Sequence, residues 1–212
     1  AGLISARVGH RRTLLVALVL GAAVSAWQAT LPGFGLFLVS RAVEGASHLA
    51  IVVAAPTLIA EISSDRQRGL ALSLWSTFFG VAFAVLVWVG LPFARAWGPG
   101  ALYGAHGVWM ALMAGLVAVL LPRDVVGPRG HLSFGEVMRD HARIYASPRL
   151  SAPALGWLCY AASWVAILTV MPARLPEGTR DWVAGTMPLA GIATSMTIGV
   201  YLLKRLPAIT VL

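Results

Sequence analysis

Residues 2–15 read GLISARVGHRRTLL, and their pattern changes abruptly from basic to apolar. Arg7, Arg11 and Arg12 cluster around Gly9, and an apolar run follows directly. Such a cluster is found in phosphate-binding loops, in processing signals and in cytoplasmic hairpins of membrane proteins. A phosphate-binding loop follows a strand, whereas this cluster precedes an apolar span, which excludes that interpretation. The rest of the chain decides between the other two.

The composition indicates a membrane protein. Of the 212 residues, 58% are hydrophobic and 11% are charged, and the mean hydropathy is +0.81. A soluble domain of this length needs more charged residues to cover its surface. A membrane-spanning helix needs about 20 mostly apolar residues, because it rises about 1.5 Å per residue across roughly 30 Å of hydrocarbon. Six such runs can be drawn, at 13–31, 36–60, 69–91, 101–121, 151–171 and 183–203.

These runs predict helices, because backbone polar groups inside lipid must be satisfied within the segment. They are too long and too continuously apolar for barrel strands. The fold class predicted is therefore all-α, a polytopic membrane helical bundle. The start lacks a signal peptide's basic region and cleavage site. Apolar sequence begins at Ala1, and a new apolar run begins near the C-terminal end, so we expect an internal fragment that is incomplete at both ends.

The distribution of Lys and Arg predicts the orientation, because these residues are retained on the cytoplasmic side. Alternate connections hold twelve of them, whereas the opposite set holds three and Arg41 lies within a span. The twelve are Arg7, Arg11, Arg12, Arg66, Arg68, Arg123, Arg129, Arg139, Arg143, Arg149, Lys204 and Arg205, and the three are Arg95, Arg174 and Arg180. This asymmetry predicts a cytoplasmic opening loop and explains the net charge of +8 without nucleic acid as a partner.

The long connection over 122–150 is predicted to be cytoplasmic. It begins with a Pro/Gly-rich turn region, PRDVVGPRG. The stretch SFGEVMRDHARIYASP then has the pattern of an amphipathic helix, in which Ser133 and Glu136 form a capping box. Its apolar face is predicted to hold Phe134, Val137, Met138, Ile144 and Tyr145. We expect a surface helix that links two halves of the protein.

The opening stretch GLISARVGHRR resembles the signature loop between the second and third helices of the major facilitator superfamily, written G-x-L-x-D-R-x-G-R-R/K. The matching positions are Gly2, Arg7, Gly9 and Arg11. Ala6 stands where the family has Asp, and His10 stands where it has Arg. With Arg12, this loop would be the cytoplasmic gate of such a transporter.

Two further stretches resemble the family in the expected order. RAVEGASH resembles the R-x-x-Q-G pattern of the fourth helix, with Arg41 and Gly45 matching and Glu44 replacing Gln. EISSDRQR places Glu61 and Arg68 at the E-x6-R spacing that some members carry where that helix leaves the membrane. The stretch between helices four and five also resembles the cyanate-transporter-like branch, and the antiporter motif G-P-x-x-G-G is not evident.

The resemblance covers the whole chain and implies three parts. Residues 1–121 would run from the end of helix two to helix six of the N-terminal half. Residues 122–150 would be the cytoplasmic loop between the halves, with its amphipathic helix. Residues 151–212 would be helices seven and eight, at the start of the C-terminal half.

Three ionisable residues lie inside the second span and need an explanation. Each costs about 2.5–3.5 kcal/mol near the midplane on insertion scales. Helical spacing places Arg41, Glu44 and His48 on one face. Two interpretations stay open: a structural ion pair that faces other helices, or a site for a proton or a substrate anion that faces the cavity. His106, early in the span over 101–121, is expected to pack or to lie at the interface.

Two aromatic pairs have helical spacing, and the family resemblance places their helices around the central cavity. They are Trp75 with Phe79 and Tyr160 with Trp164. Such pairs either contact substrate or pack between helices. Cys159, the only cysteine, excludes an intrachain disulfide and is expected to be buried. No catalytic constellation or metal-spaced His/Cys set is visible, so no enzymatic activity, cofactor or metal is expected.

The predicted function is secondary active transport of a small solute by alternating access, with a coupling proton as a candidate partner and the lipid bilayer as surroundings. The predicted location is the plasma (inner) membrane, with several passes. The alternative from another class is a membrane-embedded enzyme or a sensor or scaffold. The gate is expected to bring Arg7 and Arg11 close to Glu61, Asp65 and Arg68 in the inward-closed state, and otherwise these arginines would only fix the topology.

Overall fold

The computed structural model describes residues 2–124, 133–203 and 205. These residues form helices, with no strand among them. In chain order the elements are α1 (Gly2–Val8), α2 (His10–Gln28), α3 (Phe34–Ile62), α4 (Asp65–Ser76), α5 (Phe78–Val85), η1 (Leu86–Gly90), α6 (Leu91–Trp97), α7 (Pro99–Leu120), α8 (Phe134–Ala146), α9 (Pro148–Ala173), α10 (Glu177–Thr194), η2 (Ser195–Gly199) and α11 (Val200–Leu203).

All six predicted spans are helical, which confirms the all-α fold class. Among the described residues, four helices are long and apolar enough to cross a membrane: Phe34–Ile62, Asp65–Trp97, Pro99–Leu120 and Pro148–Ala173. The first predicted span lies in α2, whose 19 residues begin with His10, Arg11 and Arg12. Those polar residues extend the helix beyond its apolar part. The helices are longer than predicted at several ends for the same reason, because a helix continues past the hydrocarbon.

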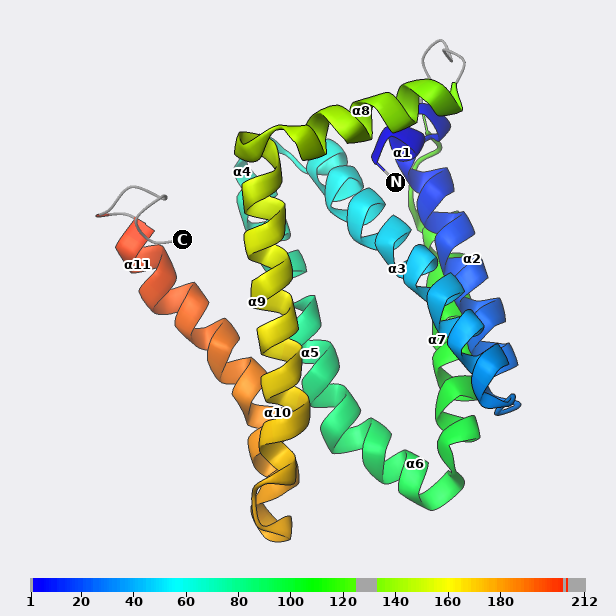
Figure 1. Cartoon of the computed structure of the whole chain (residues 1–212), viewed down its shortest axis with the longest axis vertical. Coiled ribbons are helices and arrows are strands. Elements are labelled where there is room, and N and C mark those ends of the chain that lie inside the picture. Colours follow the sequence, from blue (N-terminus) through cyan, green and yellow to red (C-terminus); the bar gives the residue numbers. More distant parts are fainter. Residues whose placement is uncertain (1, 125–132, 204, 206–212) are drawn as a thin grey trace. The chain divides into compact units, whose positions relative to one another are not determined.

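One compact unit, unit 1, consists of residues 1–73 and 93–147. Within it α2 packs against both α3 and α7 (Figure 1). Small residues allow this close approach, as is usual between membrane helices. A Cβ on Gly107 of α7 would lie 3.2 Å from the carbonyl oxygen of Ala22 in α2. Ser47 of α3 is buried and donates a 2.7 Å hydrogen bond to the carbonyl oxygen of Ala17.

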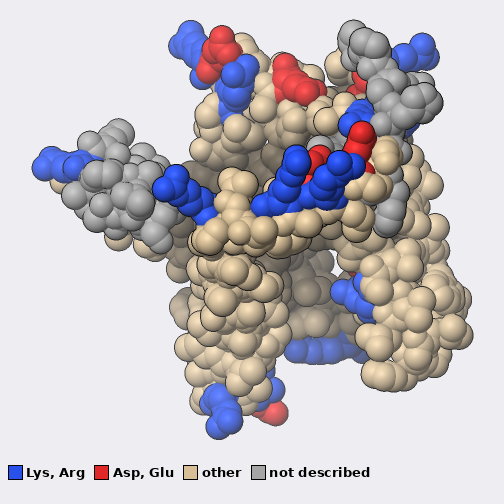
Figure 2. All heavy atoms as spheres, turned by 45° about the horizontal axis from the view of Figure 1, so that its top comes forward, with Lys and Arg blue, Asp and Glu red and all other residues tan. Residues whose placement is uncertain are grey.

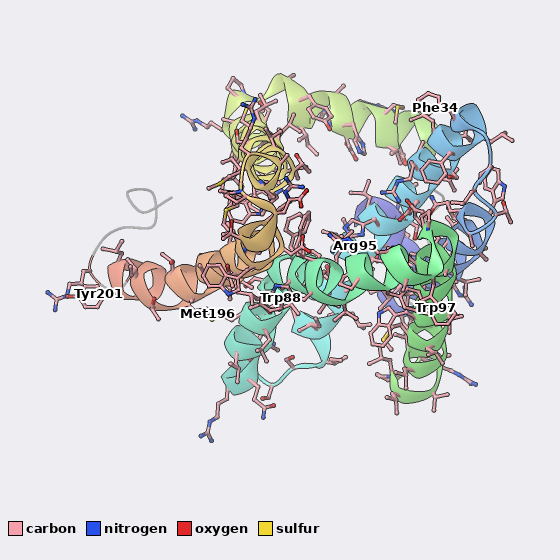
Figure 3. The ribbon with its side chains drawn as sticks, turned by 90° about the horizontal axis from the view of Figure 1, so that it is seen from below. Phe34, Trp88, Arg95, Trp97, Met196 and Tyr201 are labelled. Carbon is pink, nitrogen blue, oxygen red and sulfur yellow. The ribbon has the colours of Figure 1, made fainter. Side chains whose placement is uncertain are left out.

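The second compact unit, unit 2, consists of residues 74–92 and 148–212. Within it α5 and η1 pack against α10. A Cβ on Gly80 would lie 2.6 Å from Ile192 Cδ1, and a Cβ on Gly185 would lie 2.2 Å from Trp88 Nε1. Trp88 lies between η1 and α10 (Figure 3). The two helices therefore touch where glycine leaves room for a larger partner, with Pro188 buried beside them.

A π-helical turn, η1, interrupts the long helix of residues 65–97. The amide of Leu91 donates to the carbonyl of Leu86, five residues earlier. Pro92 follows, and proline has no amide hydrogen to continue the regular pattern. A wider turn just before proline redistributes the backbone hydrogen bonds and bends the helix locally.

Helix α8 confirms the predicted helix start in the central connection. Ser133 is the N-cap residue of Phe134–Ala146, although its side chain makes no capping hydrogen bond. Residues 125–132 of the connection, including Arg129, lie outside the described residues, as does Lys204. Helix α8 lies across the end of unit 1 that holds α1 (Figure 1). Helix α8 carries Arg139 and Arg143, and in Figure 2 the charged side chains on this face gather toward one end of the molecule, whereas the flanks of the long helices carry few.

Many large apolar side chains of the long helices are exposed, among them Leu36, Trp109 and Val119. Soluble monomers rarely expose such continuous apolar surface, whereas lipid-facing helices do. Cys159 of α9 is also exposed, so the expectation that it is buried is wrong. A small apolar residue is as stable against lipid as in a protein core, and burial rules from soluble proteins therefore do not apply to it.

Candidate functional site

The motif loop, which we define as residues 2–12, is held by an acidic residue far along the chain. The Asp124 carboxylate accepts hydrogen bonds from the backbone amides of Arg11 (2.8 Å) and Arg12 (2.9 Å). These amides belong to the first turn of α2 and have no partner within the helix. Asp124 thus supplies from outside the cap that Gly9, the N-cap residue, cannot provide. Its negative charge also favours the helix N-terminus.

Gly9 is required at this junction for two independent reasons. Its φ of +105° lies in the region that favours glycine. A Cβ at this position would also lie 2.3 Å from Asp124 Oδ2. The glycine that the family motif carries here therefore allows both the chain reversal between α1 and α2 and the close approach of the capping carboxylate.

The side chain of Arg11 faces α7. Its Nη2 donates a 2.6 Å hydrogen bond to the carbonyl oxygen of Ala118, one of the last carbonyls of that helix. A cation near a helix C-terminus is favoured by the helix dipole. Its Nε is buried without a hydrogen-bond partner among the described residues. We expected Arg11 to lie near Glu61, and the structure instead assigns it to α7.

The residue that reaches Glu61 is His10. Its Nε2 lies 3.2 Å from Glu61 Oε1, and its Nδ1 lies 2.7 Å from the hydroxyl of buried Ser5. An imidazole can donate to the carboxylate through Nε2–H while Nδ1 accepts from the serine. The histidine that stands in place of the family's arginine therefore still makes contacts here. It links α2 to Glu61 at the end of α3 and to Ser5 in α1.

Arg68 and Arg7 complete the predicted loop set. Arg68 Nε donates to the carbonyl oxygen of Ala60 (2.9 Å), and its Nη2 pairs with Asp65 Oδ1 at 2.9 Å. Glu61 and Arg68, predicted from their spacing, thus bind different groups. Arg7 lies in the last turn of α1, which begins at Gly2. These partners of His10, Arg11 and Arg68 all belong to unit 1.

A second set of polar residues, the three-helix polar cluster, lies between α2, α3 and α7. Its members are Ser25, Gln28, Ser40, Arg41, Glu44 and His106. Gln28 is completely buried, and its Nε2 donates to Glu44 Oε2 (2.7 Å) and to the hydroxyl oxygen of Ser40 (3.1 Å). Arg41 Nη1 binds the same Glu44 Oε2. The predicted Arg41–Glu44 pairing is therefore present, and it is anchored to α2 by an amide that sequence reasoning missed.

The accessibilities of the pair differ. The Glu44 side chain is 20% exposed, whereas the Arg41 side chain is 50% exposed. A carboxylate in such a site must be compensated by donors, and it has two kinds here, a guanidinium and a neutral amide. Gln28 Oε1, in contrast, is buried without a hydrogen-bond donor among the described residues.

His106 belongs to the same cluster, which changes its expected role. Its Nδ1 lies 2.8 Å from the hydroxyl of buried Ser25 in α2. Glu44, Arg41 and His48 lie close enough to interact electrostatically with its imidazole. His48 follows Glu44 by one turn of α3. The structure therefore gathers Glu44 and two histidines from α3 and α7 in one electrostatic neighbourhood.

The predicted aromatic pairs lie in unit 2, and their rings contact other aromatic rings close in the sequence. Trp75 stacks on Phe78 with ring centroids 4.9 Å apart, and Phe79 lies 5.2 Å from Phe83. Tyr160 and Trp164 are nearly parallel at 6.4 Å. Trp164 also lies beside α10, where a Cβ on Gly191 would be 3.4 Å from its ring. Tyr160 and Phe79 remain exposed. A role in lining a cavity stays a prediction.

Metal binding has no support in the part of the chain that the structure describes. Among these residues, no group of three or more His, Cys, Asp or Glu side chains is placed to hold a metal ion. The contacts that the two sites make are ion pairs and hydrogen bonds.

The comparisons with known proteins agree with the helical architecture. Residues 1–212 match the family described as Major Facilitator Superfamily. The chain belongs to this superfamily. It is 24% identical over 180 residues to the inner membrane transport protein YajR of Escherichia coli (strain K12), an alignment that covers 83% of this chain and 38% of that relative. The chain thus spans less than half the length of this curated relative. No solved structure matches it. As a member of the superfamily, it is a multi-pass membrane protein.

Two residues of these sites were not predicted from the sequence. Gln28 could have been noticed as the amide side chain near the end of an apolar span, where a polar group needs a partner. Asp124 gives no such signal, because it lies in a polar connection 113 residues from Arg11. Superfamily membership supports the resemblance of the motif loop but not the assignment to the cyanate-transporter-like branch, which stays a prediction.

Proposed function

We propose that this chain forms part of a secondary active transporter that moves a small solute by alternating access. Superfamily membership and the similarity to a bacterial transport protein support membrane transport. In this proposal residues 1–121 belong to the N-terminal half, 122–150 to a cytoplasmic connection and 151–212 to the C-terminal half. The unequal distribution of Lys and Arg supports the cytoplasmic placement of the motif loop and of α8.

In this proposal Glu44 carries the coupling proton. The observation that carries it is the double use of Glu44 Oε2 by Arg41 and by fully buried Gln28. Protonation removes the negative charge, so the ion pair within α3 and the bond to α2 both change at once. Intramembrane ionisable groups of this kind commonly mark proton or substrate pathways. One proton can therefore shift the equilibrium between two arrangements of α2 and α3. Coupling of transport to a proton requires such a shift.

The solute would bind between the halves, with Trp75, Phe79, Tyr160 and Trp164 as candidates for lining its cavity. The motif loop would act as the cytoplasmic gate. Its contacts through His10 and Arg11 tie the start of α2 to the ends of α3 and α7. In this proposal these contacts hold in the inward-closed state and break in the inward-open state, so they bias the equilibrium between the two.

The test compares proton-driven transport with solute exchange in liposomes that contain the full-length protein. A solute is first chosen by screening a panel for thermal stabilisation of the purified protein. Glu44→Gln should abolish uptake driven by a pH gradient and leave counterflow exchange of the solute intact. Glu136→Gln is the matched control, because it removes an exposed carboxylate on α8 instead of one in the span, and pH-driven uptake should persist.

Proton-driven uptake that persists in Glu44→Gln would contradict the coupling role. If Glu44→Gln instead prevents folding and neutralising Arg41 in the same protein restores it, the pair is a structural ion pair and not a coupling site.

A further inference from the structure

The Gln28 side chain, enclosed between α2 and α3, carries an unusual acceptor. Its amide nitrogen has two acceptors, Glu44 Oε2 and the Ser40 hydroxyl, whereas its oxygen is buried with no donor among the described residues. Buried polar atoms nearly always have a hydrogen-bond partner. The question is therefore which group could donate a hydrogen bond to this oxygen.

The orientation of this amide depends on the charge of Glu44. An ionised carboxylate can only accept hydrogen bonds, so the amide nitrogen of Gln28 must face it. When the proton is on Oε2, the carboxyl group donates there and needs an acceptor at the same place. A half-turn of the amide about its Cγ–Cδ bond exchanges nitrogen and oxygen and provides that acceptor.

The two groups that contact the amide nitrogen can serve either orientation of the amide. The amide nitrogen lies between Glu44 Oε2 at 2.7 Å and Ser40 Oγ at 3.1 Å. Ser40 now donates to the carbonyl oxygen of Phe37 and accepts from Gln28. After the half-turn, the amide oxygen would occupy this position and accept from the Glu44 carboxyl. The Ser40 hydroxyl can rotate to donate to it as well, because a hydroxyl serves as donor or acceptor.

We propose that Gln28 is a positioning residue that reports the protonation state of Glu44 to α2 by inverting its amide. This inference rests on the proposed role of Glu44. The proton comes from water, binds a carboxylate oxygen of Glu44 and returns to water, and no other covalent bond changes. Loss of the negative charge also releases the half-exposed Arg41 guanidinium from its ion pair. The charged or titratable groups of this neighbourhood are Arg41 and His48 on α3 and His106 on α7.

The amide inversion can be followed by infrared difference spectroscopy. The full-length protein is prepared with glutamine labelled with carbon-13 at Cδ, reconstituted in phosphatidylcholine liposomes and titrated with acid. On protonation of Glu44, the labelled carbonyl stretch of one glutamine should shift to lower frequency, because its oxygen gains donors. This shift should have the same midpoint pH as the appearance of the protonated Glu44 carboxyl band.

Substitutions show which glutamine gives the shifted amide band. The amide shift should be lost completely in Gln28→Met and in Glu44→Gln, and it should persist in Gln67→Met. Gln67 is the matched control, because it is an exposed glutamine that already accepts a 3.2 Å hydrogen bond from Ser64. Ser40→Ala should give a smaller shift at a similar midpoint, because one of the two donors is gone, and this variant serves if Gln28→Met does not fold.

The outcomes separate this inference from the proposed function. If the Glu44 carboxyl band titrates while the labelled amide bands stay fixed, or if Ser40→Ala leaves the amide shift unchanged, the inversion is wrong and Glu44 remains the proton site. If no band that depends on Glu44 titrates, both the inversion and the coupling role are wrong.

Discussion

Replacing Asp124 by alanine should destabilise the protein by about 1–3 kcal/mol. The carboxylate accepts hydrogen bonds from the amides of Arg11 and Arg12, and both become uncapped when it is removed. Loss of a helix N-cap costs about 0.5–2 kcal/mol. Loss of a negative charge at a helix N-terminus adds about 0.3–1 kcal/mol. Asp124→Asn keeps an acceptor oxygen but not the charge, and it should cost about half as much.

The assay is thermal unfolding of the full-length protein in detergent at fixed lipid content. A loss of 1 kcal/mol lowers Tm by about 2–4 °C for a domain of 150–250 residues, so Asp124→Ala should lower Tm by several degrees. Asp65→Ala is the matched control. Asp65 also lies in the first turn of a helix, but its side chain is 94% exposed and, among the described residues, pairs with Arg68 three residues on. Such a pair is worth about 0.2–1 kcal/mol. Equal Tm losses for the two variants would refute the capping argument.

Three other predictions follow from the same part of the structure. Gly9→Ala should destabilise the protein by more than about 1 kcal/mol, because its backbone φ is positive and a Cβ there would overlap Asp124. The double variant Gly9→Ala with Asp124→Ala should lose less Tm than the sum of the two single losses. Cysteine at Ser133 should resist an impermeant maleimide added outside intact cells, and efficient labelling would overturn the proposed topology. Arg11→Ala or Glu61→Gln should shift the equilibrium toward the inward-open form by about 1.4- to 5-fold, since each removes a contact worth roughly 0.2–1 kcal/mol in the inward-closed state. Unchanged transport and cytoplasmic cysteine accessibility in both variants would reduce the motif loop to a topology signal.

The helices could be predicted from the sequence because hydropathy reports the one requirement that lipid imposes on every span. The position of α8 could be predicted for a related reason, since its polar and apolar residues alternate with helical period. The π-turn η1 could not, because the proline that follows it predicts an irregularity in the helix but not its type.

The sites were predicted only in part. The Arg41–Glu44 contact is local, three residues apart on one helix, and spacing alone is enough to find it. The partner of Glu61 depends on helix rotation, and adjacent residues on a helix point about 100° apart. This is why His10 reaches Glu61 while its neighbour Arg11 faces α7. Contacts such as Asp124 with the start of α2 arise only when distant helices pack.

In this account the protonation state of Glu44 shifts the equilibrium of alternating access. A distance measured across the cytoplasmic side with pulsed electron paramagnetic resonance tests this directly. Spin labels are placed on Arg12→Cys in α2 and Arg149→Cys in α9, in a full-length protein whose native Cys159 is replaced by serine. Both labelled positions are exposed, and the Asp124 cap involves only the backbone of Arg12. The account predicts two distance populations whose ratio changes with pH, and a ratio in Glu44→Gln that stays at the acid value at every pH. A single population that ignores both pH and Glu44→Gln would contradict it.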